Sequence, residues 1–253
     1  EYVAACLSGV LSLEDTLAVL AERGRMSEEL PGGSMLAVRL SEESAGKYLN
    51  VDLSLASVNA SNLCVISGPK EKIAEVKSKL EKDGVPGRLL QTSHAFHSSM
   101  IDPILPKFIE LMEGTKLAAP SVPYVSTLTG HWIDESEATD PRYWARHFRE
   151  TVRFADGVKE LMAEGEAVFI EVGVGQTLGR VIRQICDRSR YTVVSSLGDE
   201  CSVESDQIAM QMALGQLWIN GVEADWKGYY KDEKRLRVSL PTYPFERKRY
   251  WVE

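Results

Sequence analysis

Two of the four histidines in this chain, His94 and His97, lie three positions apart within residues 91–100. An imidazole can accept and return a proton near neutral pH, so this pair is a candidate for general acid–base catalysis. Both histidines could instead be ordinary polar residues at the end of a strand, and these ten residues alone favour that interpretation. The elements that position the two side chains must decide between the two possibilities.

Arg23 is a second candidate, because its place on a predicted helix is ambiguous. Residues 12–15 resemble a capping box, which predicts that a helix begins there. Leu13, Leu17 and Leu20 recur at the helical period and define one face, and Arg23 falls at the edge of it. Taken alone, a surface arginine near the C-terminus of a helix is the better-supported interpretation.

The composition argues against several classes of function. With 253 residues, 44% of them hydrophobic, the chain can build one or two domains with a sizeable core. The formal net charge of −8 argues against a nucleic-acid-binding protein, because binding phosphates needs a concentrated basic surface, and the basic run at 246–249 is too short to provide one. No apolar run approaches the roughly 20 residues of a membrane span, so we expect no membrane association and a cytoplasmic location.

The four cysteines predict neither a metal site nor a disulfide framework. They lie far apart, without a C-x-x-C pair or a histidine at zinc-ligand spacing, which is typical of free thiols in a reducing compartment. These residues are Cys6, Cys64, Cys186 and Cys201.

Residues 34–97 show short strands alternating with helices. The hydrophobic pattern predicts strands at 35–40, 53–59, 63–67 and 88–91, and helices at 42–49 and 69–82. This βαββαβ order is that of a ferredoxin-like unit, a common scaffold that says little about function. It does place His94 and His97 where the chain leaves a small domain, a position typical of a cleft wall.

The following segments predict a second, larger unit. Strands are expected at 122–126, 168–172 and 191–195 with helices between them, a pattern typical of helices over a mostly parallel sheet. The glycines at 173, 175 and 179 resemble a dinucleotide-binding fingerprint, but the third is one residue late, so we interpret them as strand–turn–helix packing. A helix from about residue 205 and an aromatic tail at 240–251 follow, and we expect the tail to dock on another surface.

Several short motifs, in order along essentially the whole chain, resemble the acyltransferase domain of modular type I polyketide synthases. Residues 1–5 (EYVAA) are similar to the sequence that follows the family's G-H-S-x-G elbow, and residues 21–25 (AERGR) to its arginine motif. The sequences SGP at 67–69, HAFH at 94–97, YWARH at 143–147 and EVG at 171–173 follow at the expected spacing. Each motif is weak alone, but the ordered set is strong.

The resemblance implies an α/β fold with two subdomains. Residues 1–33 and 98–204 are expected to form an α/β-hydrolase-like larger subdomain, incomplete at its N-terminus. Residues 34–97 are expected to form an inserted ferredoxin-like βαββαβ small subdomain. Residues 205–253 are expected to form a C-terminal helix and the linker after the domain, which in the family folds back toward the preceding ketosynthase.

The resemblance also implies a two-step transfer of a malonyl group from coenzyme A, through a serine ester, to the phosphopantetheine thiol of an acyl carrier protein, with no bound cofactor or metal. It places the general base at His97, oriented by the backbone carbonyl of His147. Arg23 is expected to bind the free carboxylate of malonyl through its planar guanidinium. His94 and Phe96 are expected to form the selecting wall, because the H-A-F-H pattern resembles malonyl-selecting members and the bulky Phe96 narrows the space beside the α-carbon.

The nucleophile is expected to lie outside this chain, because Glu1 corresponds to the glutamate three positions after the family's serine. The expected partners are therefore the missing N-terminal segment, an acyl carrier protein, and an adjacent ketosynthase domain contacted through the C-terminal linker. Ser27, where the family more often has methionine, could change the pocket wall, whereas Ser61 is expected to be a loop variation. Two alternatives stay open: a serine hydrolase, which has no use for a carboxylate-binding arginine, and a non-catalytic docking module.

Overall fold

A computed structural model describes residues 1–187, 190–198, 205–234, 236, 238–246, 248 and 251. Its mixture of helices and sheets confirms the predicted α/β fold class. Cys201, and Arg247 and Arg249 of the basic run, lie outside the described residues; Cys6, Cys64 and Cys186 are free thiols. Among the described helices, none is both long enough and apolar enough to cross a membrane.

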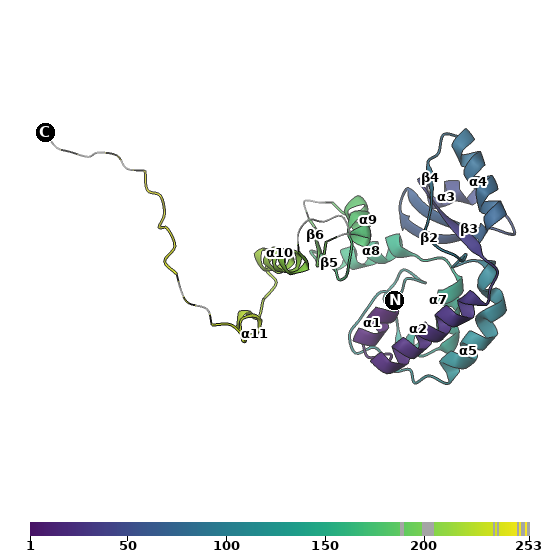
Figure 1. The fold of residues 1–253 in the computed structure, drawn as a ribbon, viewed down its shortest axis with the longest axis horizontal. Helices are drawn as coiled ribbons and strands as arrows, with labels where there is room; N and C mark the ends of the chain where they lie inside the picture. The colour runs from purple at the N-terminus through teal and green to yellow at the C-terminus, as the bar shows by residue number, and fades with distance from the viewer. Residues whose placement is uncertain are drawn as a thin grey trace.

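Four strands form an antiparallel sheet of order β2-β3-β1-β4, against which α3 and α4 pack (Figure 1). The residue pattern predicted this βαββαβ order, although α3 and β4 are shorter than expected. Ile73 and Leu80 of α4 are fully buried against Leu36 and Ile66 of the sheet, where those two residues face each other in the register. The bounds are β1 (Gly33–Val38), α3 (Glu42–Gly46), β2 (Ser54–Ala60), β3 (Leu63–Pro69), α4 (Lys70–Lys82) and β4 (Gly87–Leu89).

A helical lobe lies below this sheet in the view of Figure 1, with α1, α2, α5 and α7 gathered around one core. Trp144 and Phe148 of α7 and Phe108 of α5 are fully buried there, and they anchor the helices on which the candidate site is built. The bounds are α1 (Tyr2–Leu7), α2 (Leu13–Glu28), the 3-10 helix η1 (Ser99–Ile104), α5 (Leu105–Glu113), α6 (Glu135–Ala138) and α7 (Pro141–Arg149).

The buried face of α2 differs from the predicted one. Leu13 and Leu17 are each 59% exposed, whereas Val19 and Met26 on another face are buried in the helical core. The leucine spacing is helical, but periodicity alone does not say which apolar face meets the core. Leu13 and Leu17 therefore lie on the surface. The position of Arg23 is set by the packing of Val19 and Met26 in the helical core.

The second sheet contains only two strands among the described residues, the parallel pair β5 and β6. The predicted strand at 122–126 is wrong: Val125 makes one isolated bridge with Trp132 in a tight loop. The predicted strand at 168–172 ends one residue earlier, at Glu171, and Val172 is 81% exposed. The bounds in this region are α8 (Phe154–Ala163), β5 (Val168–Glu171), α9 (Thr177–Ile185) and β6 (Thr192–Ser195).

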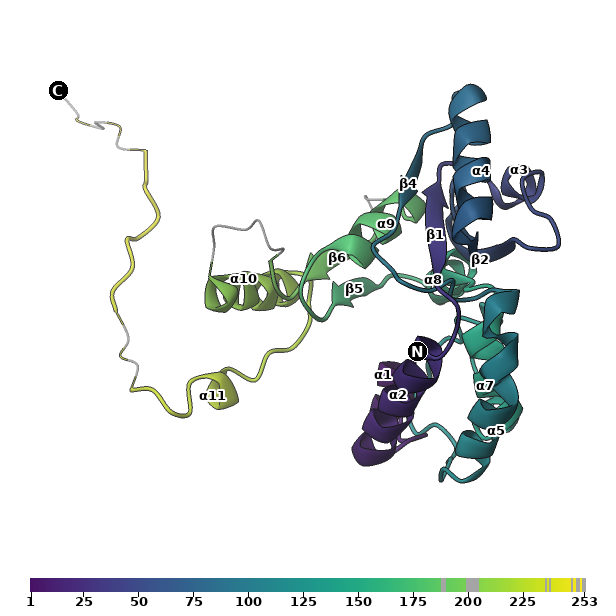
Figure 2. The same ribbon diagram turned by 45° about the vertical axis from the view of Figure 1, so that its right-hand side comes forward.

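The C-terminal region begins with α10 (Asp206–Ile219), followed by the short α11 (Trp226–Tyr229). Figures 1 and 2 show the described residues after α11 extending away from the rest of the molecule. Tyr243, Phe245 and Trp251 are each more than 70% exposed. The described residues of the aromatic tail thus lie apart from the antiparallel sheet and the helical lobe.

Candidate functional site

The segment that carries His97 is held against the start of β1. The Gly33 amide donates a hydrogen bond to the Ser93 carbonyl at 2.9 Å, and the Ser98 hydroxyl donates to the Ala95 carbonyl at 2.6 Å. Gly33 is required for this packing, because a Cβ atom there would lie 2.5 Å from that of Ala95. Among the described residues, His97 is the one non-glycine with a positive φ, 57°, a strained conformation that costs roughly 1–3 kcal/mol and is typical of functional sites.

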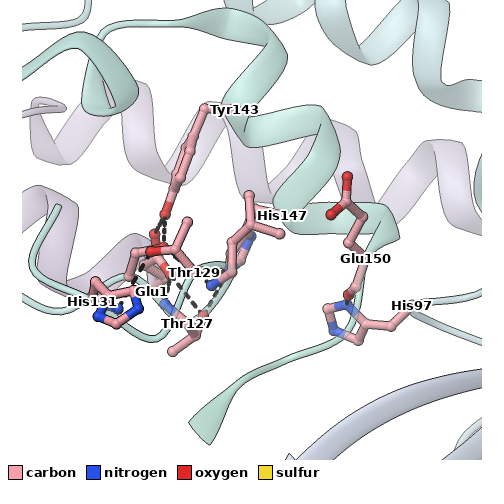
Figure 3. A network of polar contacts seen from close by, with 10 residues as sticks. Glu1, His97, Thr127, Thr129, His131, Tyr143, His147 and Glu150 are labelled. Atoms are coloured by element: carbon pink, nitrogen blue, oxygen red, sulfur yellow. Dashed lines mark hydrogen bonds and ion pairs between the residues drawn. The ribbon is translucent and has the colours of Figure 1, made fainter. Parts of the chain in front are cut away.

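The ring of His97 is oriented by the main chain of Glu150, whose oxygen lies 2.9 Å from Nδ1 (Figure 3). Glu150 ends α7 with an extended backbone (φ −85°, ψ 173°), which directs its carbonyl away from the helix. The prediction that the carbonyl of His147 orients His97 is therefore wrong. His147 lies three residues earlier, still inside the helix.

The same hydrogen bond fixes which nitrogen of the neutral His97 ring carries the proton. A carbonyl oxygen can only accept, so Nδ1 carries the proton and Nε2 of the neutral ring has a free lone pair. Burial and the positive charge of Arg23 lower the pKa of His97 to about 4. At pH 7 the imidazole is therefore neutral and can accept a proton at Nε2, as a general base must.

Arg23 is partly buried in the helical lobe, with its Nε atom fully buried, and does not fit the surface-arginine interpretation. Its Cζ atom lies 4.2 Å from the ring centre of Phe148 and 5.5 Å from that of Tyr2. Burial lowers the pKa of the guanidinium, yet an arginine stays charged, and its buried Nε has no hydrogen-bond partner among the described residues. A buried cation with an unused donor is suited to bind an anion, because the anion would satisfy both the charge and the hydrogen bond.

Aromatic rings connect Arg23 with His97. The ring of Tyr2 lies 5.7 Å from that of His147, and the His147 ring lies 6.5 Å from that of His97, nearly perpendicular to it. The structure thus brings together three residues that the sequence analysis singled out. Ser27 lies buried one turn after Arg23, and its hydroxyl donates to the Arg23 carbonyl at 2.8 Å.

His94 and Phe96 lie next to each other, with ring centres 6.2 Å apart. His94 is buried and its Nδ1 lies 2.8 Å from the hydroxyl oxygen of Ser93. Phe96 is partly buried and packs against the helical core. The hydrogen bond to Ser93 therefore holds the ring of His94, and packing against the core holds that of Phe96, close in sequence to the strained His97.

Three residues to which the sequence assigned no role in the site lie around the ring of His147, namely Glu1, Thr127 and Tyr143 (Figure 3). The Glu1 carboxylate accepts hydrogen bonds from the Thr127 amide and hydroxyl, both at 2.6 Å, and from the Tyr143 hydroxyl. Burial lowers the pKa of His147 well below its usual value, so this ring is neutral too. The one sequence signal was the i, i+4 spacing of Tyr143 and His147, which puts both on one face of α7.

No group of three or more histidine, cysteine, aspartate or glutamate side chains in the described part of the chain is placed to hold a metal ion. The groups brought together are instead a neutral imidazole with a fixed tautomer and a buried guanidinium. Such a pair can move a proton and bind an anion.

The sequence and structure are similar to those of known acyl transferases. The model of the acyl transferase domain family matches residues 1–223. A phenolphthiocerol/phthiocerol polyketide synthase of Mycobacterium tuberculosis is 36% identical over all of this chain, which spans 17% of that synthase.

Two solved structures share the fold. The acyltransferase domain from the second module of the salinomycin polyketide synthase matches with a TM-score of 0.86 and 36% identity, over 95% of this chain and 57% of that one. The acyl transferase domain of SpnD, in complex with 2-(pent-4-yn-1-yl)malonyl, matches with a TM-score of 0.84 and 35% identity, over 87% of this chain and 54% of that one. With the family match over most of its length, the chain belongs to the acyl transferase domain family.

Proposed function

We propose that this chain is the larger part of a malonyl-selective acyltransferase domain of a polyketide synthase. Malonyl-CoA and the phosphopantetheine arm of an acyl carrier protein are its substrates. The observation that carries the proposal is the contact between Nδ1 of His97 and the Glu150 carbonyl, which leaves Nε2 free to act as a base. The proposal uses only the protein's own groups, without a metal or a cofactor.

The reaction has two half-reactions, in each of which His97 takes and returns one proton. Nε2 accepts the proton of a serine hydroxyl while the serine oxygen attacks the thioester carbonyl of malonyl-CoA. The carbon–sulfur bond then breaks, and the coenzyme A thiolate takes that proton, leaving a malonyl-serine ester. In the second half the carrier thiol gives its proton to Nε2 and attacks the ester, and the released serine oxygen takes the proton back.

Arg23 gives the preference for a malonyl group. Its buried guanidinium, with an unpartnered Nε, is suited to pair with the free carboxylate that malonyl carries and acetyl lacks. The related SpnD domain is known in complex with a substituted malonyl group, which supports a substrate of this kind. Phe96 and His94 are proposed to form the wall that disfavours a substituted α-carbon.

The serine nucleophile is proposed to come from a segment that precedes Glu1. Two apolar pairs, Val3 with Leu7 on α1 and Leu13 with Leu17 on α2, are all more than half exposed. An exposed apolar surface of this kind, on two helices in contact, is suited to be covered by another segment. The fact that this chain spans 54–57% of the related acyltransferase chains supports the same proposal.

The acyl carrier protein and an adjacent ketosynthase are the proposed macromolecular partners. The polyketide synthase relative from Mycobacterium tuberculosis is a much longer protein, of which this chain spans 17%. The exposed Tyr243, Phe245 and Trp251 supply the apolar surface through which the tail is proposed to contact the ketosynthase.

The proposed function can be tested with an extended chain, in which the segment that precedes the matched region of the Mycobacterium tuberculosis relative is joined before Glu1. With malonyl-CoA and a phosphopantetheinylated carrier protein, the extended chain is expected to form malonyl carrier protein. Free malonate formed at the same rate with and without carrier protein would instead identify a hydrolase. Binding of a ketosynthase without any acylation would identify a docking module.

A further inference from the structure

A buried carboxylate that the proposed chemistry does not use lies next to the site. The Glu1 side chain is 1% exposed and accepts hydrogen bonds from three donors, two on Thr127 and one on Tyr143. These donors come from the loop after residue 122 and from α7, so one carboxylate joins the start of α1 to two distant parts of the chain (Figure 3). These hydrogen bonds offset the free-energy cost of removing the carboxylate from water. Without them the buried charge would be strongly destabilising.

Counting protons shows that the network is directed toward Glu1. The Thr127 hydroxyl has one proton, which it donates to Glu1. Nε2 of His147 lies 3.1 Å from that hydroxyl oxygen and 3.4 Å from a Glu1 carboxylate oxygen. Because Thr127 has no second proton to give, Nε2 of the neutral His147 must be protonated and donate. Each group in the network is thus held in one orientation.

Helix α7 connects this network to the general base. Tyr143 and His147 lie on one face of the helix and contact the Glu1 network, and Glu150 at its end holds Nδ1 of His97. A helix is a rigid spacer with a rise of about 1.5 Å per residue. The contacts of Glu1 with α7 therefore set the distance between the start of α1 and His97.

We propose that Glu1 is a positioning residue, whose carboxylate, through Thr127, Tyr143 and α7, holds the start of α1 at a fixed distance from His97. This inference rests on the proposed function, because the serine segment is proposed to join the chain at Glu1. Glu1 aligns the serine with Nε2, and catalysis depends on that alignment.

The first experiment uses the chain of residues 1–253 and follows ring N–H signals by ¹⁵N NMR. In the unchanged chain the Nδ1–H of His97 and the Nε2–H of His147 are expected to exchange slowly with water. In Glu1→Gln both are expected to exchange at least about tenfold faster, because the network that holds the two rings loses its buried charge. Tyr124→Phe is the matched control, because the Tyr124 hydroxyl is buried without a hydrogen-bond partner in the described residues.

The second experiment uses the extended chain and measures single-turnover acylation per titrated active site. Glu1→Gln and Tyr143→Phe are expected to lower the acylation rate constant about tenfold or more, with KM for malonyl-CoA within about twofold, and Tyr124→Phe to leave both unchanged. A Glu1→Gln variant that acylates at the unchanged rate per active site overturns the inference, whatever its melting temperature. Unchanged ring exchange in the first experiment also overturns it. If the unchanged extended chain does not acylate, the proposed function fails and the NMR result alone decides on Glu1.

Discussion

The main-chain oxygen of Glu150 and the Nδ1 atom of His97 lie 2.9 Å apart, whereas the side chain of Glu150 faces the other way. Its carboxylate accepts a hydrogen bond from Nε of Arg146 at 2.8 Å, in an ion pair that is about half exposed. The imidazole is thus oriented by a group that every residue possesses.

Glu150→Ala is therefore expected to keep most of the activity of the extended chain. The carbonyl remains, and only a surface ion pair worth about 0.3–0.5 kcal/mol is lost. The measurements are the acylation rate and the urea midpoint of unfolding. A loss of activity as large as that of His97→Ala would show that the carboxylate itself takes part, as in a Ser-His-acid triad.

Arg23→Ala is expected to reduce the preference for malonyl-CoA over acetyl-CoA by about 10- to 100-fold, since a hydrogen bond to a charged group contributes about 1.5–3 kcal/mol. Competition between the two thioesters for the extended chain measures this ratio. Arg25→Ala is the matched control, because Arg25 lies on the same helix but is exposed and paired with Glu22 and Glu29. An unchanged ratio in Arg23→Ala would remove the carboxylate-binding role.

Phe96→Ser is expected to narrow the discrimination between malonyl-CoA and methylmalonyl-CoA. One methyl group in an apolar pocket is worth about 1–3 kcal/mol, so the ratio of kcat/KM values should change by about 10- to 100-fold. His97 is unchanged in this variant, and kcat with malonyl-CoA should stay within a few fold. If methylmalonyl-CoA is used no better than before, Phe96 does not line the acyl pocket.

The stability of the 253-residue chain is expected to fall as the pH is lowered from about 6.5 to 4. The pKa of His97 is lowered from 6.5 to about 4 by burial, so between these values the unfolded state binds a proton that the folded state does not. Protonation of the unfolded state thus lowers the free energy of unfolding by up to about 3 kcal/mol at the acid end, and above pH 6.5 the effect vanishes.

Urea unfolding at several pH values measures this slope. His97→Gln should make the slope shallower and leave the part that the buried His147 contributes. His131→Gln is the control, because the His131 side chain is 71% exposed. An equal slope in all three chains would contradict the buried, neutral state of His97.

The fold of the small subdomain could be predicted because its signals are local. Alternating and helical periodicity in residues 34–97 gave all six elements in order, and the errors were limited to their ends. The face of α2 could not be predicted in this way. Leu13 and Leu17 have the right spacing but are exposed, because burial depends on which segments pack against the helix.

The resemblance singled out His97 and Arg23, and the structure brings both side chains to one region. Without the resemblance, the local sequence favoured an ordinary polar histidine and a surface arginine. The carbonyl of Glu150 has no sequence signature, so the prediction fell three residues away, on His147. Glu1 and Tyr143 are 142 positions apart in the sequence, so no local sequence pattern could predict their contact.

In the proposed function, His97 is the base for loading a malonyl group onto a serine supplied before Glu1. Intact mass spectrometry of the extended chain, after brief exposure to malonyl-CoA, tests this most directly. We expect one malonyl ester on that serine in the unchanged extended chain and a yield at least about 100-fold lower in His97→Ala. An extended chain that stays unmodified, or a His97→Ala variant that loads as fast as the unchanged one, would contradict the claim.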